Sequence, residues 1–314
     1  YMEGKIIKCV KNRYSVLTKK NELYYCSLKA SEILKKRKFS NPIAVGDFVK
    51  FSVIENEKKG IIQEVLERKN YVIREAVNLS YKAQILASNI DFAFLIVTIK
   101  NPITSLLFID RYLVTTNAYK IPTILIFNKN DIYTEHEKLL EREYKNIYKK
   151  IGLECISISV LKNRNIGSVK KYLNNNTILL SGHSGVGKTS LINLLSPSFS
   201  LKTKDISEKH KQGLHTTTFS EMVFLKEYNT SIIDSPGIKG FGLVDISKKD
   251  LVNYFPEFKN NSHNCKFKDC AHIKEPKCEI LKKIKKGEIS KSRYLNYLNM
   301  LDERVGYRKE NYNI

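Results

Sequence analysis

The chain has 314 residues, of which 42% are hydrophobic, and its 54 Lys and Arg residues against 32 Asp and Glu residues give a formal net charge of +22. The hydrophobic fraction is sufficient for packed cores, and the length predicts two or three domains rather than one. No apolar run reaches about 18 residues, so a membrane-spanning helix is not predicted. The first residues show no secretory signal pattern, and we expect a cytoplasmic protein.

The excess of positive charge favours a polyanionic partner, because neutralising nucleic-acid phosphates releases their counterions. A Lys-rich compositional bias, visible also in the abundant Asn and Ile, is the alternative explanation. Charge alone therefore favours a nucleic-acid or ribosomal partner without identifying it.

The first 76 residues predict short β-strands separated by turn residues. The expected strands are Gly4–Val10, Tyr14–Leu17, Leu23–Ser27, Asp47–Ile54 and Gly60–Val65. Five short strands without a long helix between them are typical of a small barrel, of which the oligonucleotide-binding (OB) fold is the commonest. The basic loop Lys35–Lys38 beside Phe39 is either an RNA contact or a solvated loop.

From Asn89 the pattern changes to apolar strands that alternate with helices. The expected strands are Asp91–Ile99, Thr123–Phe127, Cys155–Ser159, Phe219–Leu225 and Ser231–Asp234. The expected helices are Leu106–Tyr119, Glu135–Ile151 and Ile166–Leu173. Such alternation indicates a parallel sheet covered on both faces. We therefore expect an OB barrel over residues 1–76, an α/β domain over 77–243 and a charged helical domain over 244–314.

A complete phosphate-loop pattern, G-x-x-x-x-G-K-[ST], lies between an apolar strand at 178–180 and a helix that begins near Lys188. The segment reads Gly182, His183, Ser184, Gly185, Val186, Gly187, Lys188, Thr189 and Ser190. Glycines let backbone amides surround a phosphate, and the helix N-terminus adds positive potential. Lys188 would reach the β- and γ-phosphates, and the Thr189 hydroxyl would bind Mg²⁺.

The tetrapeptide N-K-x-D directly follows the strand Thr123–Phe127, at Asn128, Lys129, Asn130 and Asp131. A carboxylate there can accept from guanine N1–H and the 2-amino group, whereas adenine offers neither donor. Lys129 would pack over the base, Asn128 would tie this loop to the phosphate loop, and the backbone amides of Ser157–Ser159 would reach guanine O6. This pattern favours GTP and GDP as ligands. The alternative is that Asp131 only caps the helix that begins at Glu135.

The pattern D-x-x-G follows the strand Ser231–Asp234. Asp234 would hold Mg²⁺ through water, and the Gly237 amide would meet the γ-phosphate. Upstream, the polar segment 213–218 contains Thr217, which would close over Mg²⁺ and the γ-phosphate as part of a nucleotide switch. These motifs come in the order base, phosphate loop, D-x-x-G, which is a circular permutation of the ordinary GTPase order.

Catalysis cannot use the glutamine of Ras-like GTPases, because Ile238 follows Gly237. His215 is therefore our candidate for positioning the attacking water, with a structural histidine as the alternative. Lys188 and Mg²⁺ would stabilise the developing charge. Without that glutamine, intrinsic hydrolysis is expected to be slow.

Three of the six cysteines cluster with a histidine near the C-terminus, in the pattern Cys265-x4-Cys270-x-His272-x5-Cys278. A closed Cys₃His set is typical of one structural zinc ion. His263 is an alternative ligand. The other cysteines lie in apolar segments and are expected to be reduced core residues: Cys9, Cys26 and Cys155.

Basic residues follow the cysteine cluster on predicted helices, at Lys282, Lys283, Lys285, Lys286, Lys291 and Arg293. They form either a solvated helix face or an RNA contact, and the overall charge favours RNA.

The combination of a small barrel, permuted GTPase motifs and a Cys₃His cluster resembles the RsgA (YjeQ) family of circularly permuted GTPases over almost the whole chain. The resemblance implies hydrolysis of GTP to GDP and phosphate by a late assembly factor that docks on the small (30S) ribosomal subunit and its rRNA, near the decoding region. The subunit would stimulate hydrolysis, which would be coupled to release. This sequence departs from the family at Leu214, before His215, where a basic residue is usual.

Two alternatives stay open. The protein could be an RNA-binding adaptor that GTP stabilises without turnover, or a permuted GTPase that acts on the large subunit. GTPases of the latter kind generally lack this barrel and zinc module. We expect a monomer.

Overall fold

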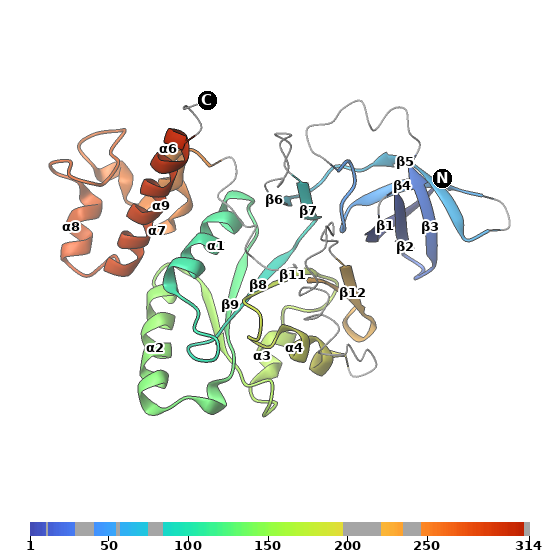
Figure 1. Ribbon diagram of the computed structural model, residues 1–314, viewed down its shortest axis with the longest axis horizontal. Helices are drawn as coiled ribbons and strands as arrows, with labels where there is room; N and C mark the ends of the chain where they lie inside the picture. Colours follow the sequence, from blue (N-terminus) through green and yellow to red (C-terminus); the bar gives the residue numbers. More distant parts are fainter. Residues whose placement is uncertain are drawn as a thin grey trace.

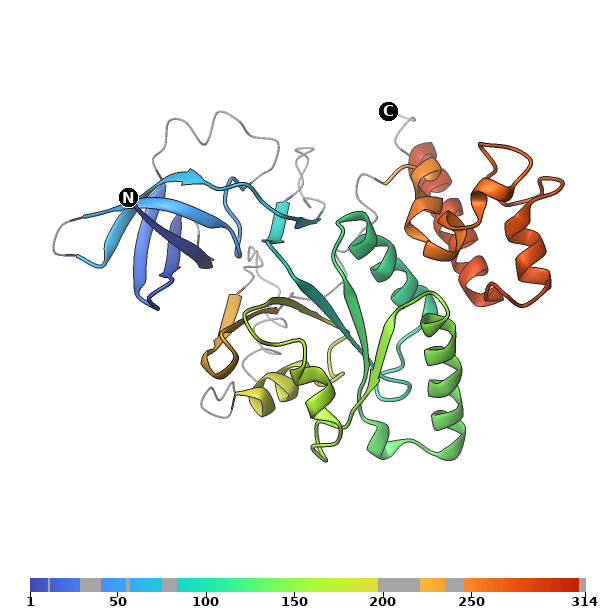
Figure 2. The same cartoon turned by 180° about the vertical axis from the view of Figure 1, so that it is seen from behind.

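The computed structural model describes residues 1–10, 12–28, 41–54, 57–74, 84–196, 221–234 and 246–310 (Figure 1). A sheet covered by helices lies in the middle of an elongated molecule, with a small barrel at one end and a group of helices at the other (Figure 2). Within the described ranges, no helix is long and apolar enough to cross a membrane.

The N-terminal part is a closed five-stranded barrel of the OB type. Its strands are β1 (Met2–Val10), β2 (Arg13–Thr18), β3 (Leu23–Leu28), β4 (Phe48–Val53) and β5 (Lys59–Val65). They pair in the order β1-β2-β3-β5-β4, and β1 also pairs with β4. Alternate residues fill the interior, as in β3, where Tyr24 and Cys26 are buried between exposed neighbours. All five predicted strands are confirmed.

The central part of the sheet has the order β10-β9-β8-β11-β13-β12. Its strands are β8 (Phe92–Val97), β9 (Thr123–Phe127), β10 (Glu154–Ser157), β11 (Thr177–Ser181), β12 (Glu221–Leu225) and β13 (Thr230–Asp234). The first five strands in that order are parallel, as predicted. Strand β12, for which the sequence indicated no direction, runs antiparallel to β13. The two are joined by the short turn η2 (Lys226–Tyr228), whereas a parallel crossover needs a dozen residues or more.

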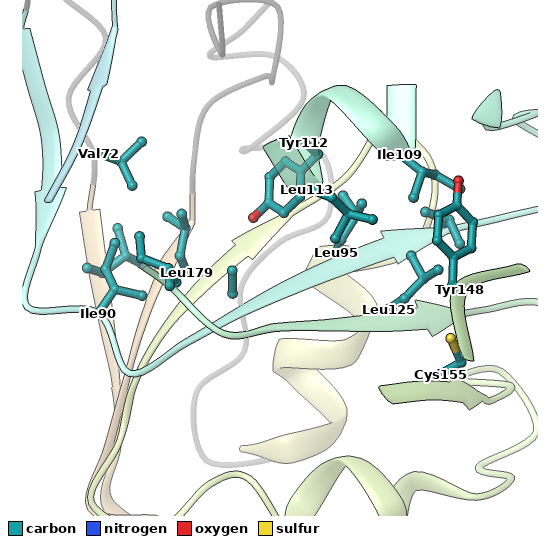
Figure 3. Close-up of a cluster of buried hydrophobic side chains, with 14 of the residues drawn as sticks. Val72, Ile90, Leu95, Ile109, Tyr112, Leu113, Leu125, Tyr148, Cys155 and Leu179 are labelled. Carbon is teal, nitrogen blue, oxygen red and sulfur yellow. The ribbon is translucent and has the colours of Figure 1, made fainter. Parts of the chain in front are cut away.

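Helices cover both faces of this sheet. The face helices are α1 (Leu106–Ala118), α2 (Glu135–Lys149), α3 (Ile166–Lys170) and α4 (Lys188–Leu195). Leu95 of β8 packs with Ile109 of α1 and Tyr148 of α2 on one face (Figure 3). Its neighbour Ile96 packs on the other face with α3 and α4, for example with Ile192. The alternation explains why the strands read as continuous apolar runs.

A two-stranded sheet that the sequence did not suggest follows the barrel. It consists of β6 (Tyr71–Arg74) and β7 (Gln84–Ser88), paired antiparallel. The boundary expected between residues 76 and 77 falls between these two strands. Ile73 and Ile85 pack together with Ala44, so the pair is held against the segment that enters β4.

The barrel is joined to the central sheet by strand pairing, and a buried ion pair at the edge of the barrel contacts β7. Strand β1 pairs antiparallel with β12 at Lys8 and Glu221, so one sheet of 11 strands runs through both parts. Asp47, which is fully buried, accepts from Arg68 Nε at 2.7 Å and from Ser88 Oγ at 2.6 Å. Arg68 therefore neutralises a carboxylate at the point where the barrel meets β7.

The C-terminal part is helical, as predicted. Its elements are α6 (Lys248–Leu251), η4 (Val252–Tyr254), α7 (Pro256–Lys259), η5 (Ser262–Asn264), α8 (Glu279–Lys285) and α9 (Lys291–Glu310). They enclose a core that includes Phe255, Phe258 and Tyr297. The idea that Arg293 contributes to a solvated or RNA-binding face was wrong, because this residue is 1% exposed and pairs with two carboxylates.

The buried ion pair of Arg68 and Asp47 should stabilise the folded protein. Replacing Arg68 by Leu leaves Asp47 buried without its cation, and we expect the folded state to lose about 3–5 kcal/mol. Chemical denaturation followed by circular dichroism measures the change. The control is Lys50→Met, which breaks an exposed pair with Glu64 and should cost about 1 kcal/mol or less. Equal effects of the two substitutions would contradict the role given to Arg68.

Candidate nucleotide and metal sites

The phosphate-loop residues follow β11 at the carboxyl ends of the parallel strands. Gly182 has φ +150° and Gly187 has φ +104°. A Cβ atom on Gly182 would lie 2.4 Å from the carbonyl oxygen of Ile96, and one on Gly187 would lie 2.4 Å from Asn128 Nδ2. Both positions therefore require glycine for close backbone approach as well as for their dihedral angles.

Lys188 lies over its own loop. Its Nζ donates to the carbonyl oxygens of Gly182 at 2.9 Å and His183 at 3.0 Å. Burial lowers the pKa of Lys188, and the charge of Asp234 opposes this shift. Asp234 ends β13 and is paired in register with Leu180 of β11, next to the loop. The sequence-predicted phosphate-binding lysine and the Mg²⁺-binding aspartate are thus brought together.

The remaining loop residues differ in their exposure and contacts. Val186 is fully buried, whereas Ser184 and Gly185 are exposed. Thr189 and Ser190 lie in the first turn of α4. The ring of His183 stacks on Phe108 of α1, with centroids 4.0 Å apart. Burial, and then the positive charge of Lys188, lower the pKa of His183.

Asn128 joins the base-side motif to the phosphate loop, as expected. Its Nδ2 donates to the carbonyl oxygen of Val186 at 2.8 Å, and its Oδ1 accepts from the amide of Val160 at 3.1 Å. The side chain is 2% exposed, so both bonds are protected from water. One amide therefore links three loops that lie far apart in the sequence.

Asp131 lies in the short helix η1 (Asn130–Ile132), where its Oδ1 accepts from Ser159 Oγ at 2.5 Å. It does not cap α2. Thr134 does, in a capping box with Glu137, so the helix-cap alternative was wrong. The carboxylate is thus held in place by a residue of the loop that follows β10.

The expectation for the backbone amides near Ser159 needs correction. The Ile158 amide donates to the carbonyl oxygen of Phe127 at 2.7 Å, and the Ser159 amide donates to that of Arg164 at 3.2 Å. These two amides are therefore not free to meet guanine O6. Ser159 contributes its hydroxyl, which orients Asp131, and this contact was not foreseen.

Two further residues that the sequence did not single out shape the base side. The hydroxyl of Tyr133 donates to the carbonyl oxygen of Asn128 at 2.6 Å and accepts from the amide of Ile99 at 2.9 Å. Lys129 Nζ donates to the carbonyl oxygen of Asn101 at 2.5 Å. Lys129 has φ +69°, which turns the motif away from the strand. The loop after β8 therefore belongs to the site.

Some predicted site residues lie outside the described part of the chain. These are His215, Thr217 and Gly237, together with the rest of segment 213–218. The basic loop Lys35–Lys38 also lies outside it.

The Cys₃His residues converge on one point in the C-terminal part. The ligand atoms of Cys265, Cys270, His272 and Cys278 all lie within 4.8 Å of one another. Cys265 Sγ lies 3.9 Å from Cys278 Sγ, and His272 Nδ1 lies 3.4 Å from Cys278 Sγ and 3.7 Å from Cys265 Sγ. Tetrahedral ligands of a metal at about 2.0–2.3 Å are separated by roughly 3.3–3.8 Å, so the set can hold a metal ion. His263 is not part of it.

The loop that carries His272 is held by other side chains. The carboxylate of Glu275 accepts from the amides of Ala271 at 2.9 Å, Ile273 at 2.7 Å and Lys274 at 3.0 Å. Burial alone would raise the pKa of Glu275, but these amide donors outweigh it and lower the pKa. The hydroxyl of Tyr294 donates to the carbonyl oxygen of His272. His272 has φ +59°, so its position depends on this support.

The surroundings of the cluster favour the neutral thiols over the charged thiolates. Burial, with the nearby thiols of Cys278 and Cys265, raises the pKa of Cys270 to about 12, and burial also raises the pKa of Cys278. A bound metal ion reverses this preference, because it coordinates the thiolate. The Glu279 amide, at the start of α8, donates to Cys265 Sγ at 3.4 Å.

The fold and the two halves of the nucleotide site define a circularly permuted GTPase. The chain has the fold of two solved proteins, YjeQ from Thermotoga maritima and YloQ, a circularly permuted GTPase. YjeQ is 30% identical with a TM-score of 0.80, over 97% of this chain and 99% of that one. YloQ is 26% identical with a TM-score of 0.74, over 96% and 95% of the two chains.

Sequence comparison identifies the family. The RsgA GTPase family model matches residues 65–244. A protein of Christiangramia forsetii named small ribosomal subunit biogenesis GTPase RsgA is 45% identical over 99% of both chains. A protein of the same name from Phocaeicola vulgatus is 46% identical over 96% of this chain and 97% of its own length. The chain belongs to the RsgA GTPase family, as its motifs suggested.

The support of the metal loop generates a prediction. Glu275→Gln keeps the shape of the side chain but removes the charge that three amides share, so the loop of His272 should loosen. We expect bound metal to be lost to a chelator roughly tenfold faster, since residues behind the ligands typically change metal affinity by about 10–100-fold. Release is followed with a colorimetric metal indicator.

The matched control is Glu279→Gln. This residue carries a carboxylate near the same cluster, but its contact with Cys265 is made by the backbone. The control should release metal at the wild-type rate. Equal release from both variants would show that Glu275 has no special part in the loop.

Proposed function

We propose that the protein hydrolyses GTP to GDP and phosphate and acts in the biogenesis of the small ribosomal subunit. The observation that carries the enzymatic half is the link between the two halves of the site. Asn128 holds the base-side loop against the phosphate loop, and Ser159 holds Asp131 beside it. The relatives named small ribosomal subunit biogenesis GTPase support the cellular role.

In this proposal Asp131 recognises guanine, because its two oxygens accept from N1–H and the 2-amino group. Lys129 and Asn130 complete the base-side loop, Lys129 with its aliphatic stem against the base plane. Phosphate is bound by the loop amides of residues 182–190 and by Lys188, whose ammonium would turn from its own loop to the β- and γ-phosphates. Thr189 and Asp234 are the residues that would hold Mg²⁺, which supplies charge neutralisation at the phosphates when bound.

Residues beyond the described ranges have proposed roles as well. His215 positions the attacking water, Thr217 closes over the γ-phosphate, and the Gly237 amide contacts that phosphate. Because Ile238 replaces the glutamine of Ras-like enzymes, hydrolysis is slow until a partner completes the site.

The Cys₃His cluster binds one structural zinc ion. The support is the donor set and its distances: three thiolates and one imidazole would fill all four positions around a tetrahedral zinc ion and leave none for a substrate. The three-part division into residues 1–76, 77–243 and 244–314 then gives an RNA-binding barrel, a GTPase domain and a zinc domain.

The partner in this proposal is the small subunit with its rRNA, which the net charge of +22 suits. The protein acts as a monomer in the cytoplasm. GTP fixes the barrel and the zinc domain in a geometry that fits the RNA, and hydrolysis of GTP lowers the affinity of the protein for the small subunit.

Guanine recognition can be tested by Asp131→Asn. An amide offers one acceptor and one donor, so it no longer matches the two donors of guanine but does match xanthine, which has N1–H beside a carbonyl oxygen. We expect GDP binding to fall at least about 100-fold, the loss of two charge-assisted hydrogen bonds, and xanthosine diphosphate binding to rise. Calorimetric titration measures both.

Ser159→Ala is the comparison, since it removes the hydroxyl that orients Asp131 but leaves the carboxylate. It should weaken GDP binding by a smaller factor and should not favour xanthine. If Asp131→Asn binds GDP as the wild type does, Asp131 is not the base-reading group.

The cellular role is tested by GTP turnover of the purified protein alone, with small subunits, and with large subunits. Stimulation by small subunits only is the expected result. Stimulation by large subunits only would favour a GTPase of the large subunit. Negligible turnover with either would favour the alternative of an RNA-binding adaptor that GTP stabilises, and would contradict the proposal.

A further inference from the structure

Helix α1 belongs to two hydrophobic cores at once. Ile109, Tyr112 and Leu113 are buried in the core on one face of the central sheet (Figure 3). Val114 is buried in the core of the C-terminal part, and Leu107 packs against the same core. Figures 1 and 2 both place α1 between the sheet and the C-terminal helices. Helix α1 therefore packs against both the central sheet and the C-terminal helices.

A buried ionic group fixes α1 against α9 and α7. Arg293 of α9 donates from Nη1 to Asp110 Oδ1 of α1 at 2.6 Å, and from Nε and Nη2 to the Glu257 carboxylate at 2.5 and 3.0 Å. Asn296 and Tyr148 also donate to Asp110, at 2.6 and 2.9 Å. Arg293 and Asp110 are 1% and 0% exposed. Such a group tolerates little displacement, because any broken contact leaves a charge buried without its partner.

The first turn of the same helix touches the phosphate loop. The ring of Phe108 lies with its centroid 4.0 Å from that of His183, at an interplanar angle of 31°. The backbone amide of Phe108 donates to the capping hydroxyl of Ser105, which fixes the start of the helix. The carbonyl oxygen of His183 in turn accepts from Lys188 Nζ at 3.0 Å. The position of α1 therefore bears on His183, which is itself a residue of the phosphate loop.

We propose that Arg293 is a positioning residue for the phosphate loop. Through Asp110 it fixes α1, and through Phe108 the helix fixes the phosphate loop at His183. This inference rests on the proposed guanine-nucleotide site. The affinity for nucleotide then depends on the C-terminal part of the chain, and by thermodynamic reciprocity nucleotide stabilises that part.

The first experiment measures binding of GDP with Mg²⁺ to the full-length, metal-loaded protein by calorimetry. Phe108→Leu removes the ring contact but keeps an apolar side chain, and the dissociation constant for GDP should rise by about three- to tenfold, the range that a ring pair contributes. Phe108→Tyr keeps the ring and should bind GDP as the wild type does.

The matched control is Phe92→Leu. Phe92 also makes a ring pair, with Tyr172 at 5.5 Å, but it lies at the opposite end of β8. Its loss should leave GDP binding unchanged. The preference for GDP over inosine diphosphate, which lacks the 2-amino group, should stay the same in every variant. The reason is that Asp131 and Ser159 are not part of the relay, that is, the chain of contacts from Arg293 through Asp110 and Phe108 to the phosphate loop.

The second experiment tests Arg293 itself. Arg293→Lys keeps the positive charge but cannot bridge two carboxylates. The dissociation constant for GDP should therefore rise, as it does in Phe108→Leu. The double variant with Phe108→Leu should bind GDP about as weakly as Phe108→Leu alone, because both changes act through one contact. A purely structural role for Arg293 predicts independent, multiplied effects. Metal content shows whether the C-terminal part stays folded.

The outcomes are distinguishable. Wild-type GDP affinity in Phe108→Leu, or multiplied effects in the double variant, would overturn the relay. If Arg293→Lys does not fold, the GDP affinities of the Phe108 variants and of Phe92→Leu still test whether α1 positions the phosphate loop. A wild-type protein that binds no GDP would overturn the proposed function instead.

Discussion

The nucleotide site depends on the hydrogen bond from Asn128 to the carbonyl oxygen of Val186. The base-side motif and the phosphate loop are separated by more of the chain than either motif spans, and permutation has reversed their order. A base and its phosphates can be bound together only if the two loops keep one spacing. The hydrogen bond between Asn128 and Val186 maintains this spacing, because Asn128 is buried and Gly187 has no side chain that would displace Asn128. Substitution at Gly187 would act on the base side as well as on the phosphate side.

Local supports of the same kind recur around both sites. Ser159 orients Asp131, Tyr133 ties two loop backbones together, and Glu275 gathers the amides around His272. In each case a buried or half-buried polar group fixes the backbone that carries a functional side chain. Residues of this kind contribute through preorganisation, since a site held in its binding geometry needs less ordering when the ligand arrives.

The sequence predicted the motif residues because phosphate, guanine and metal binding each demand particular residue types at fixed spacing. Gly182, Lys188 and Asp131 are recognisable for this reason. It could not predict Tyr133 or Glu275, because their partners are backbone atoms that no residue pattern marks. Arg293 was misread as part of a basic surface, since a lysine-rich helix gives no sign that one of its cations faces two carboxylates from other elements.

Strand order was predictable only in part, for a related reason. Apolar runs located the strands of the central sheet to within two or three residues. The antiparallel direction of β12 agrees with the short connection, residues 226–230, that the predicted strand bounds leave, because a parallel crossover needs a dozen residues or more. The short sheet of β6 and β7 escaped notice because four or five residues give too little periodicity to stand out from a loop.

The pairing of β1 with β12 has a consequence for solubility. Without the barrel, β12 would be an outer strand with unpaired amides and carbonyls along one side, a surface onto which a strand of another molecule can add. In the full chain β1 takes that position at the start of β12, where Lys8 pairs with Glu221, and the barrel beyond it closes on itself through β1 and β4. The N-terminal part thus covers the start of this margin of the central sheet, and a closed barrel beside it hinders the addition of a strand from another molecule.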